Sequence, residues 1–169
     1  LQDNQAQDAV AWDFRDGRPA RGHDAYGTVS LDGSARGVLL ARGDGYEKPL
    51  FWGHAQNAYH FTVGDWASLG AVPAGAGAPN VYQGANGLGV TLVPFGGPAA
   101  LQRYNGTNIA AVGGTAPAGL ACVAFFRLSQ RFLGFKDAED ILRWCAINDQ
   151  TAWTTGDGGS EKVGNDRRP

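Results

Sequence analysis

Acidic side chains are the only groups in this sequence numerous enough to supply acid–base catalysis. A glycosidase-type site would need two of them facing each other across a sugar. Most lie beside glycine or in predicted turns, where an Asp side chain caps the backbone of its own turn. The carboxylates in question are Asp13, Asp16, Asp44, Glu47, Asp65, Asp137, Glu139, Asp140 and Asp149. We expect solvated turn residues, no catalytic residue and no enzymatic activity, and a hydrolase is the least favoured function.

The three histidines and two cysteines offer little for a metal site. No i, i+4 histidine pair and no Cys-x-x-Cys motif is present. His54 and His60 would lie on neighbouring strands, which keeps a shared ligand set open, but for them and His23 we expect surface or rim positions. Cys122 and Cys145 lie in apolar runs and are expected to be buried free thiols. We predict neither a metal nor a cofactor.

The bulk composition favours strands joined by turns. The chain has 169 residues, of which 26 are glycine, and its formal net charge is −2. The charges are scattered, so they form no basic stripe for nucleic acid and no polybasic membrane patch. No apolar run approaches the length of a membrane-spanning helix, and no segment keeps helical spacing.

Large side chains recur at a spacing of about 43 residues, which is in the range of propeller repeats. The corresponding residues are Phe61 and Tyr104, Trp66 and Ile109, and Gly70 and Gly113. In a looser third copy, Trp144 takes the place of Tyr104 and Trp153 that of Trp66. Asn105-Gly106 predicts a hairpin turn with positive φ at both residues. The expected turn glycines are Gly64, Gly70, Gly106 and Gly113.

Around this recurrence the chain divides into three sets of four short strands. They are predicted at 37–41, 49–53, 57–61 and 65–69; at 80–83, 89–93, 101–104 and 108–112; and at 121–126, 131–135, 141–146 and 151–154. Further strands are predicted at 9–15 and 28–31. Four strands in each repeat are typical of β-propeller blades. The fold class is therefore all-β with about three blade-like repeats, and a β-sandwich is the alternative.

The recurring rings have two interpretations. Packing between neighbouring sheets would bury them and maintain the repeat. Exposed rings would instead be stacking platforms for sugars, as in a carbohydrate-binding module. We favour the core interpretation for Phe61, Trp66, Tyr104, Ile109, Trp144 and Trp153.

We expect one blade-type domain over residues 1–155, followed by a polar, glycine-rich tail or linker over 156–169. The sequence contains no methionine, which indicates a processed chain or a piece of a longer one. Three sets are few for a closed ring, since propellers use 4–8 blades.

Several phrases resemble virion proteins of bacteriophage tails. They are Asp13-Phe14-Arg15-Asp16-Gly17-Arg18, residues 58–61 with Asp65-Trp66, residues 89–93 leading to Tyr104-Asn105-Gly106-Thr107 and to 113–117, residues 123–127 with 131–134, and Arg143-Trp144 ahead of 149–153. Departing from that pattern, Ala146-Ile147 replaces an expected serine-aspartate phrase, and the chain is shorter.

The resemblance implies a β-propeller component similar to the tail nozzle proteins of short-tailed phages. It would be located in the virion, in a ring around the tail axis. Its partners would be copies of itself and neighbouring phage tail proteins, and DNA would pass non-specifically through a channel. A carbohydrate-binding or host-surface-binding propeller module is the alternative.

Overall fold

The computed structural model describes residues 12–13, 18–19, 35–53, 57–71 and 82–163. Nearly all regular structure in these ranges is β-strand, and the short 3₁₀ helix Arg127–Ser129 is the helical element among them. The strands β1 (Trp12–Asp13) and β2 (Arg18–Pro19) form a small antiparallel pair. The prediction for 28–31 lies outside the described residues.

Three four-stranded antiparallel sheets make up the rest, each a meander of consecutive strands. Sheet I holds β3 (Ala35–Gly43), β4 (Tyr46–Gly53), β5 (Asn57–Phe61) and β6 (Trp66–Ala71). Sheet II holds β7 (Ala85–Gly87), β8 (Val90–Val93), β9 (Gln102–Tyr104) and β10 (Ile109–Ala111). Sheet III holds β11 (Leu120–Phe126), β12 (Arg131–Lys136), β13 (Ile141–Trp144) and β14 (Gly159–Lys162). The predicted all-β class with four-stranded, blade-like sheets is confirmed.

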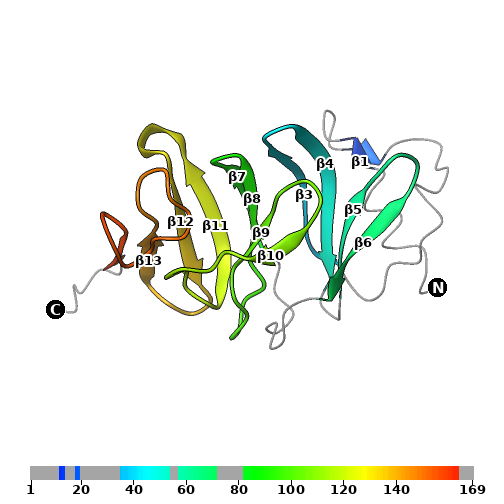
Figure 1. Cartoon of the computed structure of the whole chain (residues 1–169). Coiled ribbons are helices and arrows are strands. Elements are labelled where there is room, and N and C mark those ends of the chain that lie inside the picture. Colours follow the sequence, from blue (N-terminus) through cyan, green and yellow to red (C-terminus); the bar gives the residue numbers. More distant parts are fainter. Residues whose placement is uncertain (1–11, 14–17, 20–34, 54–56, 72–81, 164–169) are drawn as a thin grey trace.

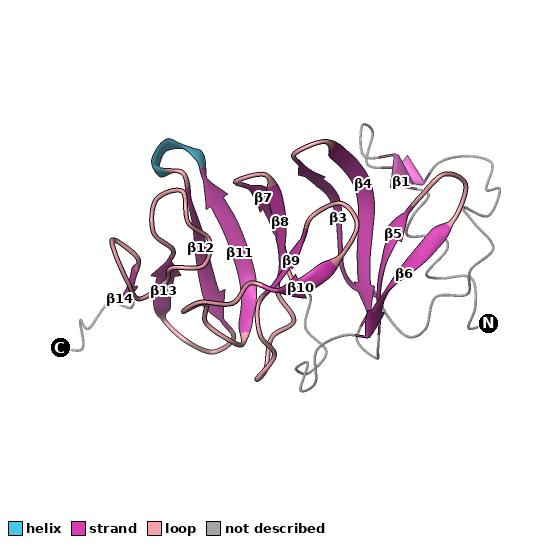
Figure 2. Cartoon of the chain, in the orientation of Figure 1, coloured by secondary structure: helices cyan, strands magenta, loops and turns pink. Residues whose placement is uncertain are grey.

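The sheets stack face to face in chain order, with sheet II in the middle (Figures 1 and 2). Contacts between sheets concentrate on their first strands, since β7 lies against β3 on one side and against β11 on the other. Gly87 allows β7 to lie close to β11, because a Cβ at this position would lie 2.3 Å from the Phe125 ring. A sandwich would have two sheets, whereas these residues form three in a row.

Two apolar cores fill the spaces on either side of sheet II. The first includes Leu50 and Trp52 of sheet I with Val93 and Tyr104 of sheet II. The second joins Leu92 of sheet II to residues of sheet III, among them Val123, Phe132 and Cys145. Because alternate residues of β8 enter different cores, Thr91, Leu92 and Val93 are all buried.

The recurrence of about 43 residues corresponds to equivalent hairpins in sheets I and II. Phe61 pairs with Trp66 across β5 and β6, and Tyr104 pairs with Ile109 across β9 and β10. Both turns span four residues and close in the same way. Thr62 N donates to Asp65 O at 2.8 Å, and Asn105 N donates to Asn108 O at 3.2 Å.

The Asn105-Gly106 turn differs from the predicted two-residue type. Gly106 has φ +95°, but Asn105 is not among the described residues with positive φ. Its side chain explains the difference, because Asn105 Oδ1 accepts hydrogen bonds from the backbone N–H groups of Thr107 and Asn108. The Asn caps a wider loop from inside, so the prediction of positive φ at both residues is wrong.

Two predicted strands are also misplaced. Of the strand expected at 80–83, residues 80 and 81 lie outside the described part of the chain. Gln83 forms only an isolated parallel bridge to Cys122, and the first strand of sheet II begins at Ala85. The strand expected at 151–154 is a loop that carries Trp153, and the fourth strand of sheet III is β14. This strand lies within the 156–169 segment that the sequence suggested as a tail or linker.

Candidate functional site

A polar network crosses the interface between sheets I and II and has Tyr104 at its centre. Tyr104 is fully buried, and its hydroxyl donates to the carbonyl oxygen of Gly106 at 2.8 Å. Because the hydroxyl hydrogen of Tyr104 is used in that bond, His60 is the donor in the second one, from Nδ1 to the phenol oxygen at 2.6 Å. Lys48 Nζ also donates to Gly106 O, at 2.9 Å. The third strands of the two sheets are therefore joined by side chains as well as by the core.

Tyr46 joins the same network from the start of β4. Its hydroxyl donates to Tyr104 O at 2.9 Å and lies 3.2 Å from Thr91 Oγ1. Thr91 donates in turn to Asn86 Oδ1. The rings of Tyr46 and Tyr104 meet edge to face with centroids 5.3 Å apart, a geometry that the aromatic quadrupole favours.

Burial shifts the ionisation of these groups away from charge. It raises the pKa of Tyr104 to about 12, with a smaller contribution from Tyr46. It also raises the pKa of Tyr46. Burial lowers the pKa of His60, and the positive charge of Lys48 lowers it further. The tyrosines and the histidine are thus neutral near pH 7, as a buried hydrogen-bonded contact requires.

The prediction that His60 is a surface or rim histidine is wrong, because 7 % of its area is exposed. The partner that explains its burial is Tyr104, which lies 44 positions away in the sequence. His23 and His54 lie outside the described residues. In the described part of the chain, no group of three or more His, Cys, Asp or Glu side chains could hold a metal ion.

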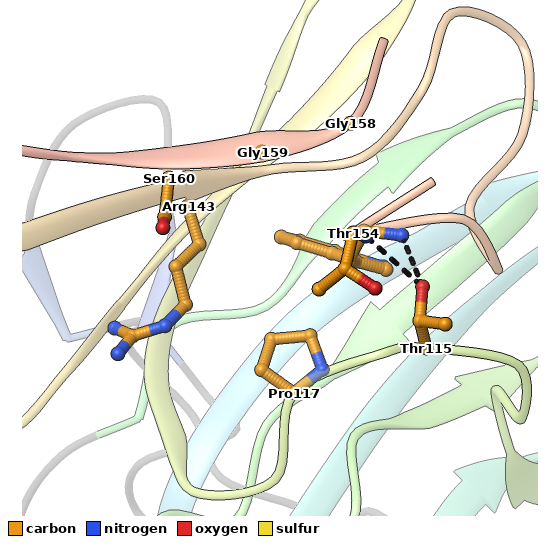
Figure 3. Close-up of a pocket in the computed structure, with 8 residues that line it drawn as sticks. Thr115, Pro117, Arg143, Thr154, Gly158, Gly159 and Ser160 are labelled. Atoms are coloured by element: carbon orange, nitrogen blue, oxygen red, sulfur yellow. Dashed lines mark hydrogen bonds between the residues drawn. The ribbon is translucent and has the colours of Figure 1, made fainter. Parts of the chain in front are cut away.

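A second feature is a pocket of about 250 Å³ between sheet III and the connector that follows sheet II (Figure 3). Its lining residues are Thr115, Pro117, Arg143, Trp153, Thr154, Gly158, Gly159 and Ser160. Thr115 organises one wall, because its Oγ1 accepts hydrogen bonds from the backbone N–H groups of Trp153 and Thr154. Arg143 stands opposite and forms an ion pair with Glu139.

The pocket can offer hydroxyl groups and one guanidinium to a small polar molecule. Thr154 and Ser160 are exposed, whereas the Trp153 ring has 2 % of its area exposed and donates from Nε1 to Gln150 O. The tryptophan therefore supports the wall and presents little stacking surface.

The other predicted repeat residues do not all lie on the same face of their sheets. Phe61 and Trp66 lie on the face of sheet I that points away from sheet II, together with Phe51 and Tyr59. Trp144 pairs with Leu133, while Cys145, one residue later, packs in the core toward sheet II. In the third copy, Cys145 and not Trp144 is therefore on the face that corresponds to Tyr104, since a shift of one residue reverses the face.

The four predicted turn glycines all adopt positive φ, from +77° at Gly113 to +98° at Gly70. Gly106 has a second constraint, because a Cβ there would lie 2.7 Å from the Tyr46 ring. Both cysteines are free thiols, with Cys145 buried and Cys122 partly buried. Burial raises the pKa of each thiol.

Of the predicted carboxylates, Asp149 has the clearest role. Its Oδ1 accepts hydrogen bonds from the hydroxyl and the backbone N–H of Thr151. These bonds lower its pKa. It caps a turn, as expected from sequence. The sequence analysis did not select Asp157, although its carboxylate accepts hydrogen bonds from Arg131 and from the Ile147 N–H, and its backbone carbonyl accepts one from Trp144 Nε1.

Comparison with known proteins identifies no relative, since no protein-family model, no curated protein and no solved structure matches the chain. Among the described residues, no helix is long and apolar enough to cross a membrane.

Proposed function

We propose that this chain is a non-catalytic structural component of a bacteriophage tail, similar to a nozzle protein, whose sheets are blades of a β-propeller-type ring around the tail axis. The tail assignment follows from the sequence resemblance, and one observation supports the blade arrangement: three consecutive four-stranded meanders pack face to face with their first strands adjacent. In a propeller, such first strands line the central channel.

The distribution of polar groups also supports a structural role. Tyr104 and His60, whose pKa values are shifted by burial, lie between the sheets and form a hydrogen bond with each other. They join the sheets and present no reactive atom to a substrate. The partners would be further copies of the chain and neighbouring tail proteins, and the channel would pass DNA without gripping it.

Electron microscopy tests this assignment. Gold-labelled antibody against the purified chain should decorate the tails of virions of the phage that encodes it. Label on capsids, or on no particle, would overturn the tail assignment. An antibody against a capsid protein is the control for access to the particle surface.

A second candidate function is saccharide binding at the pocket beside Trp153. Arg143, Thr154 and Ser160 supply the polar groups that such a ligand needs, around a small hollow. Added host-surface polysaccharide should then change the tryptophan fluorescence, and Ser160→Tyr, which adds a large ring among the lining residues, should abolish the change. An unchanged spectrum would remove this candidate.

A further inference from the structure

The sequence contains two Asn-Gly pairs, and the fold holds them differently. Asn105-Gly106 lies in the turn between β9 and β10, whereas Asn86-Gly87 lies within β7. In an Asn-Gly pair the backbone nitrogen of the glycine can attack the asparagine side chain, because glycine has no side chain that hinders the approach. The product is a five-membered succinimide, which water opens to aspartate or isoaspartate.

Hydrogen bonds hold the Asn105 side chain in an orientation that favours this attack. Its Oδ1 accepts from the backbone N–H groups of Thr107 at 3.1 Å and Asn108 at 2.9 Å, and from the Thr107 hydroxyl at 3.2 Å. Bonds to residues two and three places ahead draw Cγ toward the Gly106 nitrogen between them. The same donors point at the oxygen on which negative charge develops during the attack, as in an oxyanion hole.

The attacking Gly106 N–H and the leaving Nδ2 group of Asn105 form no hydrogen bond with any described residue. No bond within the described part of the chain therefore has to break at either nitrogen before they react. Gly106 is buried, whereas Asn105 is exposed, so water meets the pair from the side of the asparagine.

Asn86 is held in the opposite way. Its Oδ1 accepts from the backbone N–H of Arg42 at 3.0 Å and from the Thr91 hydroxyl at 2.7 Å, and its Nδ2 donates to Leu40 O at 2.9 Å. These bonds attach both ends of the carboxamide to β3 and β8, away from the backbone that follows it. Gly87 in addition belongs to the β7–β8 ladder, which fixes its nitrogen in an extended strand.

From this contrast we propose that Asn105, and not Asn86, is a site of spontaneous deamidation in the folded chain. The Gly106 nitrogen bonds to Asn105 Cγ, and its proton passes through water to Nδ2, which leaves as ammonia. Water then adds to either carbonyl of the succinimide, and the ring C–N bond at that carbonyl breaks. The net change is the exchange of ammonia for water.

Isoaspartate at position 105 loosens the junction between sheets I and II. Its main chain runs through the side-chain carbonyl, which adds a methylene group ahead of Gly106. The Gly106 carbonyl accepts hydrogen bonds from the Tyr104 hydroxyl at 2.8 Å and from Lys48 Nζ at 2.9 Å. The longer backbone displaces this carbonyl from both donors, so the chemistry of the turn is coupled to the contact between the sheets.

Peptide mapping by mass spectrometry during incubation of the folded chain in warm buffer tests the proposal. Trypsin cuts after Arg103 and so places the two asparagines in different peptides. Conversion adds about 1 Da. We expect Asn105 to convert on the order of tenfold faster than Asn86, or more. The chain unfolded in guanidinium chloride is the control, because the two identical dipeptides should then convert at similar rates.

Thr107→Val removes one donor to Asn105 Oδ1 and keeps a branched side chain, so it should slow the conversion several-fold. Thr62→Val is the matched control in the equivalent turn of sheet I, where the Thr62 hydroxyl donates to Asp65 O, and it should leave the rate unchanged. Circular dichroism establishes that both variants are folded. Equal rates for Asn105 and Asn86 in the folded chain, no conversion at either, or an unchanged rate in Thr107→Val would overturn the proposal.

Thermal unfolding of the isoaspartate form, separated by ion exchange, measures its effect on the junction. Asn105→Asp is the control, because it has the same added charge and an unchanged backbone. The isoaspartate form should unfold at a lower temperature than Asn105→Asp. Equal midpoints would overturn the coupling between the turn and the junction.

Discussion

At the scale of single residues, the junction between sheets I and II depends on the hydroxyl of Tyr104. It satisfies the Gly106 carbonyl and the His60 ring in a site that water does not reach. Buried polar groups that lose a partner keep their desolvation cost without compensation.

We expect Tyr104→Phe to lower the free energy of unfolding by about 1–3 kcal/mol, because His60 loses its buried partner while the ring is retained. Urea denaturation followed by tryptophan fluorescence measures this change. Phe135→Tyr adds a hydroxyl at a partly exposed site and serves as the control, with a much smaller effect expected. Equal effects of the two changes would show that the network contributes little.

The lowered pKa of His60 predicts a loss of stability in acid. The unfolded histidine takes up a proton near pH 6.5, before the folded one does, so stability is full above that pH and falls as the pH drops toward the lowered folded value. Thermal unfolding of the parent and of His60→Gln between pH 7.5 and 5 measures the effect. The parent should lose stability over this range, and His60→Gln should show a flatter profile.

Only some of these contacts between single residues could be predicted from the sequence. The recurrence of large rings identified Tyr104 as a core residue, and local turn chemistry identified Asp149 as a cap. The network was missed because its members are far apart in sequence, with 58 positions between Tyr46 and Tyr104. Contacts at that distance depend on how two sheets stack, which no local pattern specifies.

At the scale of elements, the equivalent turns of sheets I and II differ in what surrounds their glycines. Gly64 and Gly106 have φ of +93° and +95°. No heavy atom lies within 4 Å of a Cβ placed on Gly64, whereas one on Gly106 would meet the Tyr46 ring.

We therefore expect Gly64→Ala to cost about 1–2 kcal/mol, the strain of a left-handed backbone. Gly106→Ala should cost about 1–3 kcal/mol more, because Tyr46 must also move. The difference in urea midpoint between the two variants measures the added steric term. Equal costs would mean that Tyr46 moves aside freely.

β14 explains why the end of sheet III was harder to predict than the repeat in sheets I and II. Its residues, Gly159 to Lys162, are polar or small and show no apolar alternation, because an edge strand needs little burial to complete a ladder. The tryptophan at 153 was a stronger local signal, but it belongs to the loop that supports the pocket.

A chain that ends at Thr155 should be less stable than one that ends at Val163, by on the order of 3 kcal/mol from several hydrogen bonds of about 1 kcal/mol each. The shorter chain loses β14 and the Asp157 contacts to Arg131 and Trp144. Thermal unfolding of the two chains provides the comparison. Identical midpoints would show that β14 adds nothing to sheet III.

At the scale of the whole molecule, the three sheets form a linear stack in which sheet II touches both neighbours. Sequence patterning predicted the three four-stranded sheets and most of their strands, because each meander is local. It did not predict which face Trp144 occupies, since a shift of one residue in a loosely matched repeat reverses the assignment.

The meander order has a consequence for synthesis. Every strand pair in sheets I to III joins neighbours in the chain, so each sheet can complete its hydrogen bonds without waiting for distant segments. Sheet I can therefore form on the ribosome while sheet III is still being translated. Each later sheet can then pack against a sheet that has already formed. Such a polypeptide would fold one sheet after another, beginning at its amino-terminal side.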